Sequence, residues 1–202
     1  MRMPPLTTAR LLIRPFVPDD LDAIHRILDS ELADADMGTE GRTTLDARRS
    51  WLQWAALNHE ELARLYQPPY GDRAIVLRAS GELIGACGYV PCLGPYGQLP
   101  NVPLPGAIAP EAAVPEVGLY YAISPRHQRR GYATEAARAL IDYAFAELRL
   151  GRIIATTTDD NAASQGVMRA LEMDLARNSR PTPPWLQVVG VLTNPNATSS
   201  HE

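Results

Sequence analysis

The strongest periodic pattern in the chain lies between residues 133 and 148, where Ala, Leu, Ile and Phe recur at i, i+3, i+4, i+7 and i+8. This spacing puts the apolar side chains on one face and predicts a long amphipathic helix. Gly151 is expected to end that helix. Similar spacing after turn and cap residues predicts a helix over residues 18–28 and another over residues 161–171.

A further helix is expected between these segments. It begins near Thr44 and runs through Leu57 on the spacing of its tryptophan and leucine side chains. Asn58 is followed three residues later by Glu61, a pairing that is typical of a new helix start. The sequence therefore predicts a second, short helix that continues to Tyr66.

Runs of apolar and β-branched residues predict strands over residues 10–16, 73–79, 82–90, 116–123, 152–158 and 185–192. Ser80 and Gly81 join the second and third strands into a hairpin. Gly85 and Gly88 in the third strand either weaken it or mark a bulge. Because amphipathic helices separate most of the strands, the pattern indicates a mixed α/β sheet, and the whole chain, residues 1–202, is expected to form a single domain.

The composition changes sharply over residues 91–115, which are rich in proline and glycine. Regular structure is not expected there, and the insert is predicted to form a long ordered or semi-ordered loop. The polar tail over residues 193–202 is expected to fray.

Charge and cysteine content narrow the function classes. The net charge is −4, which argues against a general nucleic-acid-binding protein. All 19 basic residues are arginine, so neither a P-loop lysine nor Schiff-base chemistry is available. Cys87 and Cys92 alone cannot form a zinc site, and no metal is expected. No secretory signal or membrane-length apolar run is seen, so a cytoplasmic protein without a membrane partner is expected.

The chemistry is concentrated in residues 124–136, between a predicted strand and the longest predicted helix. Backbone N–H groups in the first turn of a helix have no internal partner, and the small residues Gly131 and Ala133 would let a phosphate approach them. Arg126, Arg129 and Arg130 add positive charge. The segment is either an anion cradle, suited to a pyrophosphate, or a solvated basic turn in which the glycine serves packing.

Residues 128–133, Gln-Arg-Arg-Gly-Tyr-Ala, resemble the Gln/Arg-x-x-Gly-x-Gly/Ala acetyl-CoA signature of the GNAT N-acetyltransferase superfamily. Residues 116–121 and 152–158 resemble the fourth and fifth strands of that family, and residues 161–164 resemble its Asn-x-x-Ser helix start. Residues 8–16 resemble the opening strand of the branch that contains ribosomal-protein N-terminal acetyltransferases. The likeness runs in the family's order along most of the chain.

The resemblance implies an α/β, GNAT-like fold: a mixed, mostly antiparallel central sheet flanked by helices, with a V-shaped splay between strands four and five. Acetyl-CoA, as co-substrate, would lie in that splay. Its pantetheine arm would pair with the backbone of Tyr121, Ala122 and Ile123, and Asn161 would contact the pantetheine, cap its own helix, or do both. The remaining contacts, to the pyrophosphate, would come from Gln128, Arg129, Arg130, Gly131, Tyr132, Ala133 and Thr134.

The resemblance also implies direct attack of an amine on the thioester. Glu116 would accept the amine proton; otherwise it is an ordinary exposed carboxylate at a strand end. Met168 occupies the position where many family members place a proton-donating Tyr. Ser164 is then the candidate donor to the leaving thiolate, unless it only caps its helix. The same helix ends in Leu-Glu-Met, so Glu172 stands where the family usually has Gly.

The acceptor is left open by the sequence. The acidic segment from Asp29 to Glu40 is either a rim that favours cationic amines or a solvated loop. A small-molecule amine or a protein N-terminus would fit the resemblance, whereas nucleic acid and membrane would not, and a homodimer is open. The alternative function is a GNAT-fold acyl-CoA-binding or regulatory module without efficient turnover.

Overall fold

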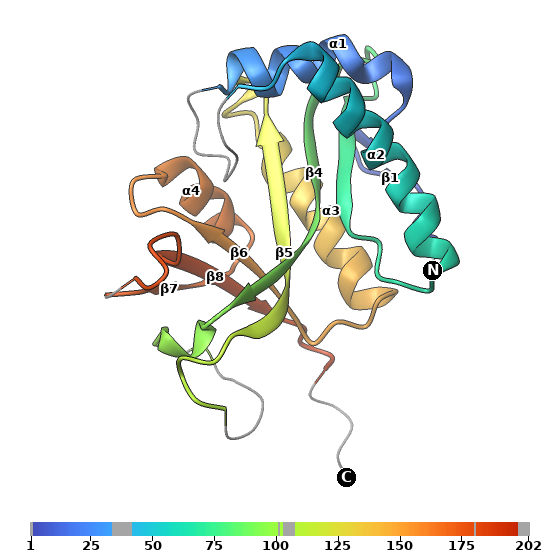
Figure 1. Ribbon diagram of the computed structural model, residues 1–202. Helices are drawn as coiled ribbons and strands as arrows, with labels where there is room; N and C mark the ends of the chain where they lie inside the picture. Colours follow the sequence, from blue (N-terminus) through green and yellow to red (C-terminus); the bar gives the residue numbers. More distant parts are fainter. Residues whose placement is uncertain (1, 34–41, 101, 103–107, 180, 198–202) are drawn as a thin grey trace. The chain divides into compact units, whose positions relative to one another are not determined.

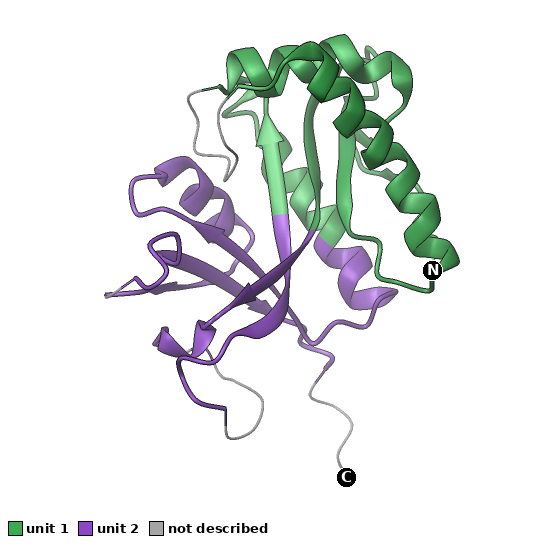
Figure 2. Cartoon of the chain, in the orientation of Figure 1, with its two compact units in different colours: residues 1–89, 120–140 green, residues 90–119, 141–202 purple. Residues whose placement is uncertain are grey.

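The computed structural model describes residues 2–33, 42–100, 102, 108–179 and 181–197. The chain divides into two compact units (Figure 2). Unit 1 contains residues 1–89 and 120–140, and unit 2 contains residues 90–119 and 141–202. None of the described helices has the length and apolar character that crossing a membrane requires.

The strands form a sheet in the order β1-β2-β3-β4-β5-β6-β8-β7. Their bounds are β1 Leu6–Thr7, β2 Leu11–Arg14, β3 Gly71–Leu77, β4 Leu83–Gly94, β5 Val114–Ile123, β6 Arg152–Thr157, β7 Asp174–Arg177 and β8 Val188–Thr193. The strand pairs β1–β2, β2–β3, β3–β4, β6–β8 and β7–β8 are antiparallel, whereas β5 and β6 are parallel, with Gly118 opposite Ile154. The mixed, mostly antiparallel α/β sheet is thereby confirmed, and the V-shaped splay stays a prediction.

Unit 1 packs helices against strands β2 to β4. A 3-10 turn, Pro18–Asp20, leads into α1, Leu21–His25, and a π-helical segment, Arg26–Glu31, follows. In Figure 1, α2, Leu45–Arg64, lies in front of β3 and β4, and the first half of α3, Tyr132–Ala146, lies behind them. The core on the α1/α2 face contains Phe16, Ile24, Ile27, Leu52, Ala74, Val76 and Ala86.

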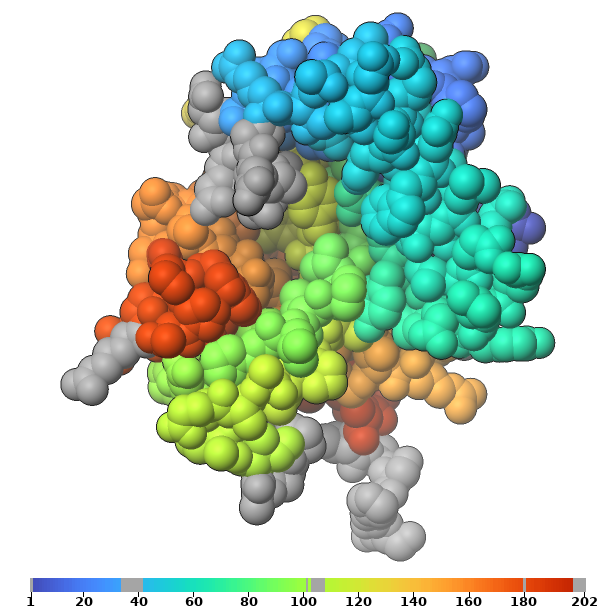
Figure 3. All heavy atoms as spheres, viewed as in Figure 1, coloured from blue at the N-terminus to red at the C-terminus, as the bar shows by residue number. Residues whose placement is uncertain are grey.

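The predicted second cap at Asn58 is wrong, because α2 is one continuous helix. Thr44 is its N-cap and accepts a hydrogen bond from the Ala47 N–H at 3.2 Å. The Asn58 side chain instead donates to the Tyr70 carbonyl at 2.8 Å, which ties the helix to the start of β3. Figure 3 shows α2 in cyan and teal with its outer side uncovered. Trp54 of this helix is exposed.

Unit 2 builds its own core around β6, β8 and β7. The buried residues of that core include Tyr96, Ile154, Leu186 and Val189. Asn161 caps α4, Ala162–Ala170, which packs beside β6 and β7. The prediction that residues 91–115 lack regular structure is wrong at both ends, because β4 runs to Gly94, a 3-10 turn covers Tyr96–Gln98 and β5 begins at Val114. Residues 101 and 103–107 of the insert, and 198–202 of the tail, lie outside the described part.

Three boundaries also differ from expectation. Helix α3 ends at Ala146 rather than near Gly151, and Arg149 adopts the left-handed φ of 53°. The last strand begins at Val188 instead of Trp185. Strands β1 and β7 are too short to leave a periodic pattern and were not predicted. A bulge is confirmed beside Gly85, since the β3–β4 register shifts between Ile75 and Val76, whereas the pairing around Gly88 is regular.

Candidate functional site

The strand-to-helix turn of unit 1 contains the residues that the sequence predicts as an anion cradle. Strand β5 ends at Ile123, whose carbonyl accepts a hydrogen bond from the Gln128 side chain at 2.9 Å. Gly131 has a φ of 79°, and Tyr132 then begins α3. This φ lies in the left-handed region that glycine adopts without a steric penalty. Backbone N–H groups in the first turn of a helix have no partner within the helix, and the binding of a pyrophosphate at this turn stays a prediction.

The three arginines of this turn have different roles. Arg126 forms an ion pair with Glu31, so its charge is committed within unit 1. Arg129 and Arg130 are exposed, and Arg129 takes a φ of 57°. The Arg130 carbonyl accepts a hydrogen bond from the Arg10 guanidinium at 2.9 Å. All three arginine side chains are therefore exposed beside the helix start, and Arg126 is the one that pairs with Glu31.

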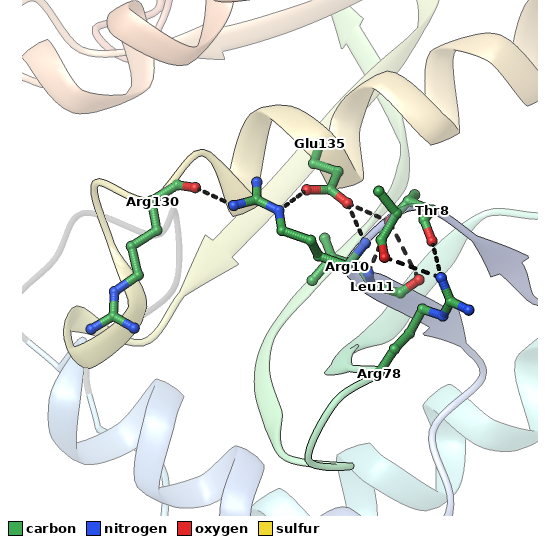
Figure 4. A network of polar contacts seen from close by, with 7 residues as sticks. Thr8, Arg10, Leu11, Arg78, Arg130 and Glu135 are labelled. Carbon is green, nitrogen blue, oxygen red and sulfur yellow. Dashed lines mark hydrogen bonds and ion pairs between the residues drawn. The ribbon is translucent and has the colours of Figure 1, made fainter.

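A polar network holds the first turn of α3 against the N-terminal strands (Figure 4). The Glu135 carboxylate accepts hydrogen bonds from the Thr8 hydroxyl at 2.6 Å and from the Arg10 backbone N–H at 2.9 Å. The Arg10 guanidinium donates to the same carboxylate at 2.6 Å and lies over the Tyr132 ring. Burial alone would raise the pKa of Glu135, but these bonds hold it below its usual value. The network fixes where the candidate cradle begins.

Glu116, the predicted base, lies in unit 2 and is buried. Its side chain is 8% exposed, so the alternative of an exposed strand-end carboxylate is wrong. The Arg152 Nε donates to Glu116 Oε2 at 3.0 Å, and a second guanidinium nitrogen contacts the other oxygen. Any amine that gives a proton to Glu116 must compete with this two-point ion pair. The sequence could not show it, because Arg152 follows 36 residues later.

The start of α4 holds the other two predicted residues of unit 2. The Asn161 side chain accepts a hydrogen bond from the Ser164 N–H at 3.0 Å, which confirms the capping role of Asn161. Ser164 is half-buried in the first turn. Met168 is fully buried, and its side chain fills the space above Gly190, where a Cβ would lie 3.2 Å from Met168 Sδ. Contact of Asn161 and Ser164 with acetyl-CoA stays a prediction.

The acidic segment is partly neutralised. Asp29 is buried, accepts two hydrogen bonds from Arg48 at 2.8 Å, and so is no part of an open rim. Glu31 accepts from the Ser124 hydroxyl and pairs with Arg126. Arg26, five residues before Glu31, pairs with it as well, whereas Arg48 and Arg126 come from segments more distant in sequence. The remaining acidic residues, Asp34, Asp36 and Glu40, lie outside the described part.

A polar group that sequence reasoning missed lies in unit 1. Asp72 is half-buried on β3, and burial raises its pKa to about 6, although the charge of Arg48 opposes this rise. The charge of Asp72 also raises the pKa of Tyr120, after burial itself. One signal could have found this group: Asp72 shares a strand face with the core residues Ala74 and Val76.

The cysteines and the described metal-ligand residue types add no second site. Cys87 and Cys92 are unpaired thiols whose pKa burial raises. Among the residues that the structure describes, His, Cys, Asp and Glu form no group of three or more able to hold a metal ion.

Comparison with known proteins settles the family. The profile of the acetyltransferase (GNAT) domain matches residues 10–174. The chain belongs to the GNAT acetyltransferase family. A relative from Bacillus subtilis (strain 168), the uncharacterized N-acetyltransferase YoaA, is 30% identical over 166 residues, which are 82% of this chain and 80% of YoaA.

Solved GNAT structures share the fold. The acetyltransferase from Agrobacterium tumefaciens str. C58 has a TM-score of 0.67 at 24% identity, and the match covers 95% of each chain. RimL, a ribosomal L7/L12 alpha-N-protein acetyltransferase solved in complex with coenzyme A, has a TM-score of 0.63 at 13% identity over 93% of this chain and 96% of RimL. The chain is therefore a GNAT N-acetyltransferase, an enzyme class that depends on acetyl-CoA.

Proposed function

We propose that this GNAT enzyme transfers the acetyl group of acetyl-CoA to a primary amine by direct attack within a ternary complex. The observation that carries the proposal is the turn from Ile123 into α3, with Gly131 at a φ of 79° and exposed arginines beside it. A helix start of this kind binds phosphate through N–H groups and the positive end of the helix dipole.

Residues 128–134 would hold the pyrophosphate of the coenzyme. The pantetheine arm would lie along β5 and pair with the backbone of Tyr121, Ala122 and Ile123, in the manner of an added strand. These contacts would use main-chain groups of β5. Tyr121, the first of the three residues, is half-buried. Acetyl-CoA supplies the electrophilic thioester carbon, and the protein supplies its position. Holding amine and thioester together can account for much of the acceleration.

The amine must be neutral when it attacks, so a base has to take one proton. Glu116 remains a candidate, although its ion pair with Arg152 occupies both oxygens. Ser164 would donate a proton to the departing thiolate, which is a tolerable leaving group because an ordinary thiol pKa lies near ~8.5. The buried Met168 cannot replace it as a donor.

The acceptor is proposed as a protein N-terminus or a small-molecule amine. RimL and the ribosomal-protein-S5-alanine acetyltransferase from Vibrio fischeri, which has a TM-score of 0.64 at 16% identity, favour a protein N-terminus. The neutralised charges at Asp29 and Glu31 remove part of the argument for a strongly cationic acceptor.

The experiment is thiol release from acetyl-CoA in the presence of amine panels: peptides with different N-termini, polyamines, aminoglycosides and amino acids. We expect turnover with one of these classes and coenzyme A binding that Gly131→Val abolishes. An exposed control on α2, Arg64→Ala, should change neither. Coenzyme A binding without thiol release from any amine would instead favour the binding module, which the Glu116–Arg152 pair and Met168 support.

A further inference from the structure

Three residues of unit 1 lie in one row across the sheet. Asp72 on β3 pairs directly with Gly88 on β4. The Ser124 N–H donates to the Ile84 carbonyl at 2.8 Å, and counting back along the antiparallel strands from this bond places Tyr120 opposite Gly88. Directly opposite residues point to the same face of a sheet. Asp72 and Tyr120 therefore face the same way, with only a glycine between them.

The close approach of β3 requires a glycine at position 88. A Cβ at this position would lie 2.2 Å from the Gly71 carbonyl oxygen, a distance that backbone cannot accommodate. Because position 88 carries no side chain, no side chain of β4 separates Asp72 from Tyr120 in this row. Adjacent strands are about 4.8 Å apart, so the backbones of Asp72 and Tyr120 are separated by roughly 10 Å.

The Asp72 carboxylate is available to a ligand. Within the described part of the chain, no residue donates a hydrogen bond to it, and the residue keeps some solvent exposure. Arg48 lies near it, but hydrogen bonds to Asp29 occupy that guanidinium. The other titratable neighbours are Tyr120 on β5, the buried Cys87 on β4, and His59 on α2, which contacts only the Asp72 carbonyl at 3.0 Å.

We propose that Asp72 and Tyr120 bind the acceptor amine over Gly88 and that Asp72 accepts its proton. The inference rests on the proposed function and deepens it. A carboxylate with open acceptor sites beside a phenol matches a primary ammonium group, which offers three donors. Tyr120 directly precedes the strand segment proposed for the pantetheine arm, so one strand would bring amine and thioester together.

Acetyl-CoA is the only other reactant that acetylation of this amine needs. The ammonium group gives one proton to the Asp72 carboxylate, and the nitrogen lone pair attacks the thioester carbon. The C–N bond forms as the C–S bond breaks, and the nitrogen loses a second proton to solvent as the neutral amide forms. Sulfur departs with the bonding electron pair and is protonated to give coenzyme A. Burial supports this role, because it raises the pKa of Asp72 to about 6 and makes the carboxylate a better base.

The test compares Asp72→Asn with the wild-type protein, using an amine that the panel identifies. We expect kcat/KM for the amine to fall about 100-fold or more, with the KM for acetyl-CoA unchanged. In the wild-type protein kcat/KM should fall below about pH 6, and this acid limb should be absent from the variant. Tyr120→Phe should raise the KM for the amine about 10-fold and keep the limb.

Asp46→Asn is the matched control, since Asp46 is exposed at the start of α2 in the same unit. Far-UV circular dichroism and coenzyme A affinity report whether each variant folds. If Asp72→Asn does not fold, Asp72→Glu replaces it as the test variant, and we expect the acid limb of its kcat/KM profile to shift. If the wild-type protein turns over and Asp72→Asn changes kcat/KM by less than twofold and keeps the acid limb, the inference about Asp72 is wrong and the proposed function still stands. Failure of the wild-type protein to bind coenzyme A would overturn the proposed function as well.

Discussion

At the scale of single residues, the raised pKa of Asp72 links folding stability to pH. In the unfolded chain an aspartate titrates near pH ~3.9, whereas burial raises the pKa of Asp72 to about 6 in the folded protein. Between these values the folded state binds more protons than the unfolded state. Stability from this residue is therefore greatest below about pH 4 and is lost as pH rises through 6.

Replacing Asp72 with Asn should remove that dependence. Relative to the variant, the wild-type free energy of unfolding should fall by up to about 3 kcal/mol between pH 4 and pH 7. Urea unfolding at four pH values measures the difference, and subtraction cancels the contributions of the other carboxylates. Asp46→Asn should follow the wild-type curve. Parallel curves for Asp72→Asn and the wild-type protein would contradict the assigned pKa.

Glu172 offers a second prediction at this scale. It adopts a φ of 63° just after α4, is exposed, and holds the place where glycine is favoured. Glu172→Gly should relieve the steric cost and stabilise the protein by about 0.5–1 kcal/mol. The thermal midpoint measures this gain. Glu172→Ala keeps a Cβ and should give none, so equal effects of the two variants would refute the backbone explanation.

These residues also show what the sequence could indicate. The missing glycine after Leu171 was visible, because a helix end has a local signature. The sequence could not show the burial of Glu116 or its pairing with Arg152, since the two residues meet only because their strands are adjacent in the sheet. Asp72 was missed although its period-2 spacing with Ala74 and Val76 places it on the core face of its strand.

At the scale of elements, local sequence predicted best where one segment decides its own structure. The turn into α3 is such a case, since Gly131 and the small residues after it are needed there whatever packs nearby. Asn58 is the opposite case. Its spacing with Glu61 favours a helix cap, but the Asn58 side-chain amide donates a hydrogen bond to the Tyr70 carbonyl and α2 continues. Tertiary contacts overrode a local signal worth about 1 kcal/mol.

The Glu135 network predicts how α3 depends on the N-terminal strands. Glu135→Gln weakens the bonds to Thr8 and Arg10, and we expect a loss of about 1–2 kcal/mol in unfolding free energy at pH 7. The folded pKa of Glu135 lies below its usual value, so its contribution is present above about pH 4.5 and is lost as pH falls. Chemical denaturation at pH 7 and pH 3.5 tests both statements.

The control for Glu135→Gln is Glu61→Gln. Glu61 forms an exposed ion pair with Arg64 one turn along α2, and such pairs contribute less than about 1 kcal/mol. If Glu135→Gln costs no more than Glu61→Gln, the network does not anchor α3. If it also leaves coenzyme A affinity unchanged, the anchoring has no bearing on the cradle.

At the scale of the whole molecule, the order of strands and helices identified the sheet, although it could not give every strand. Strand β7 lies at the end of the strand order beside β8, and its four residues acquire their structure from that partner. The described parts of each unit contain a separate apolar core, and the family profile extends across residues of both.

A ligand that binds only the folded state stabilises it by mass action, about 2.7 kcal/mol at a concentration 100 times its Kd. Coenzyme A should therefore raise the thermal midpoint by several degrees. Pantetheine, which lacks the diphosphate, should raise it much less, because the proposed anchor is the start of α3. Gly131→Val should abolish the difference between the two ligands, since a β-branched side chain strains a φ of 79° and crowds the amides. Equal shifts from coenzyme A and pantetheine would place the binding energy away from residues 128–134 and remove the observation on which the proposed function depends.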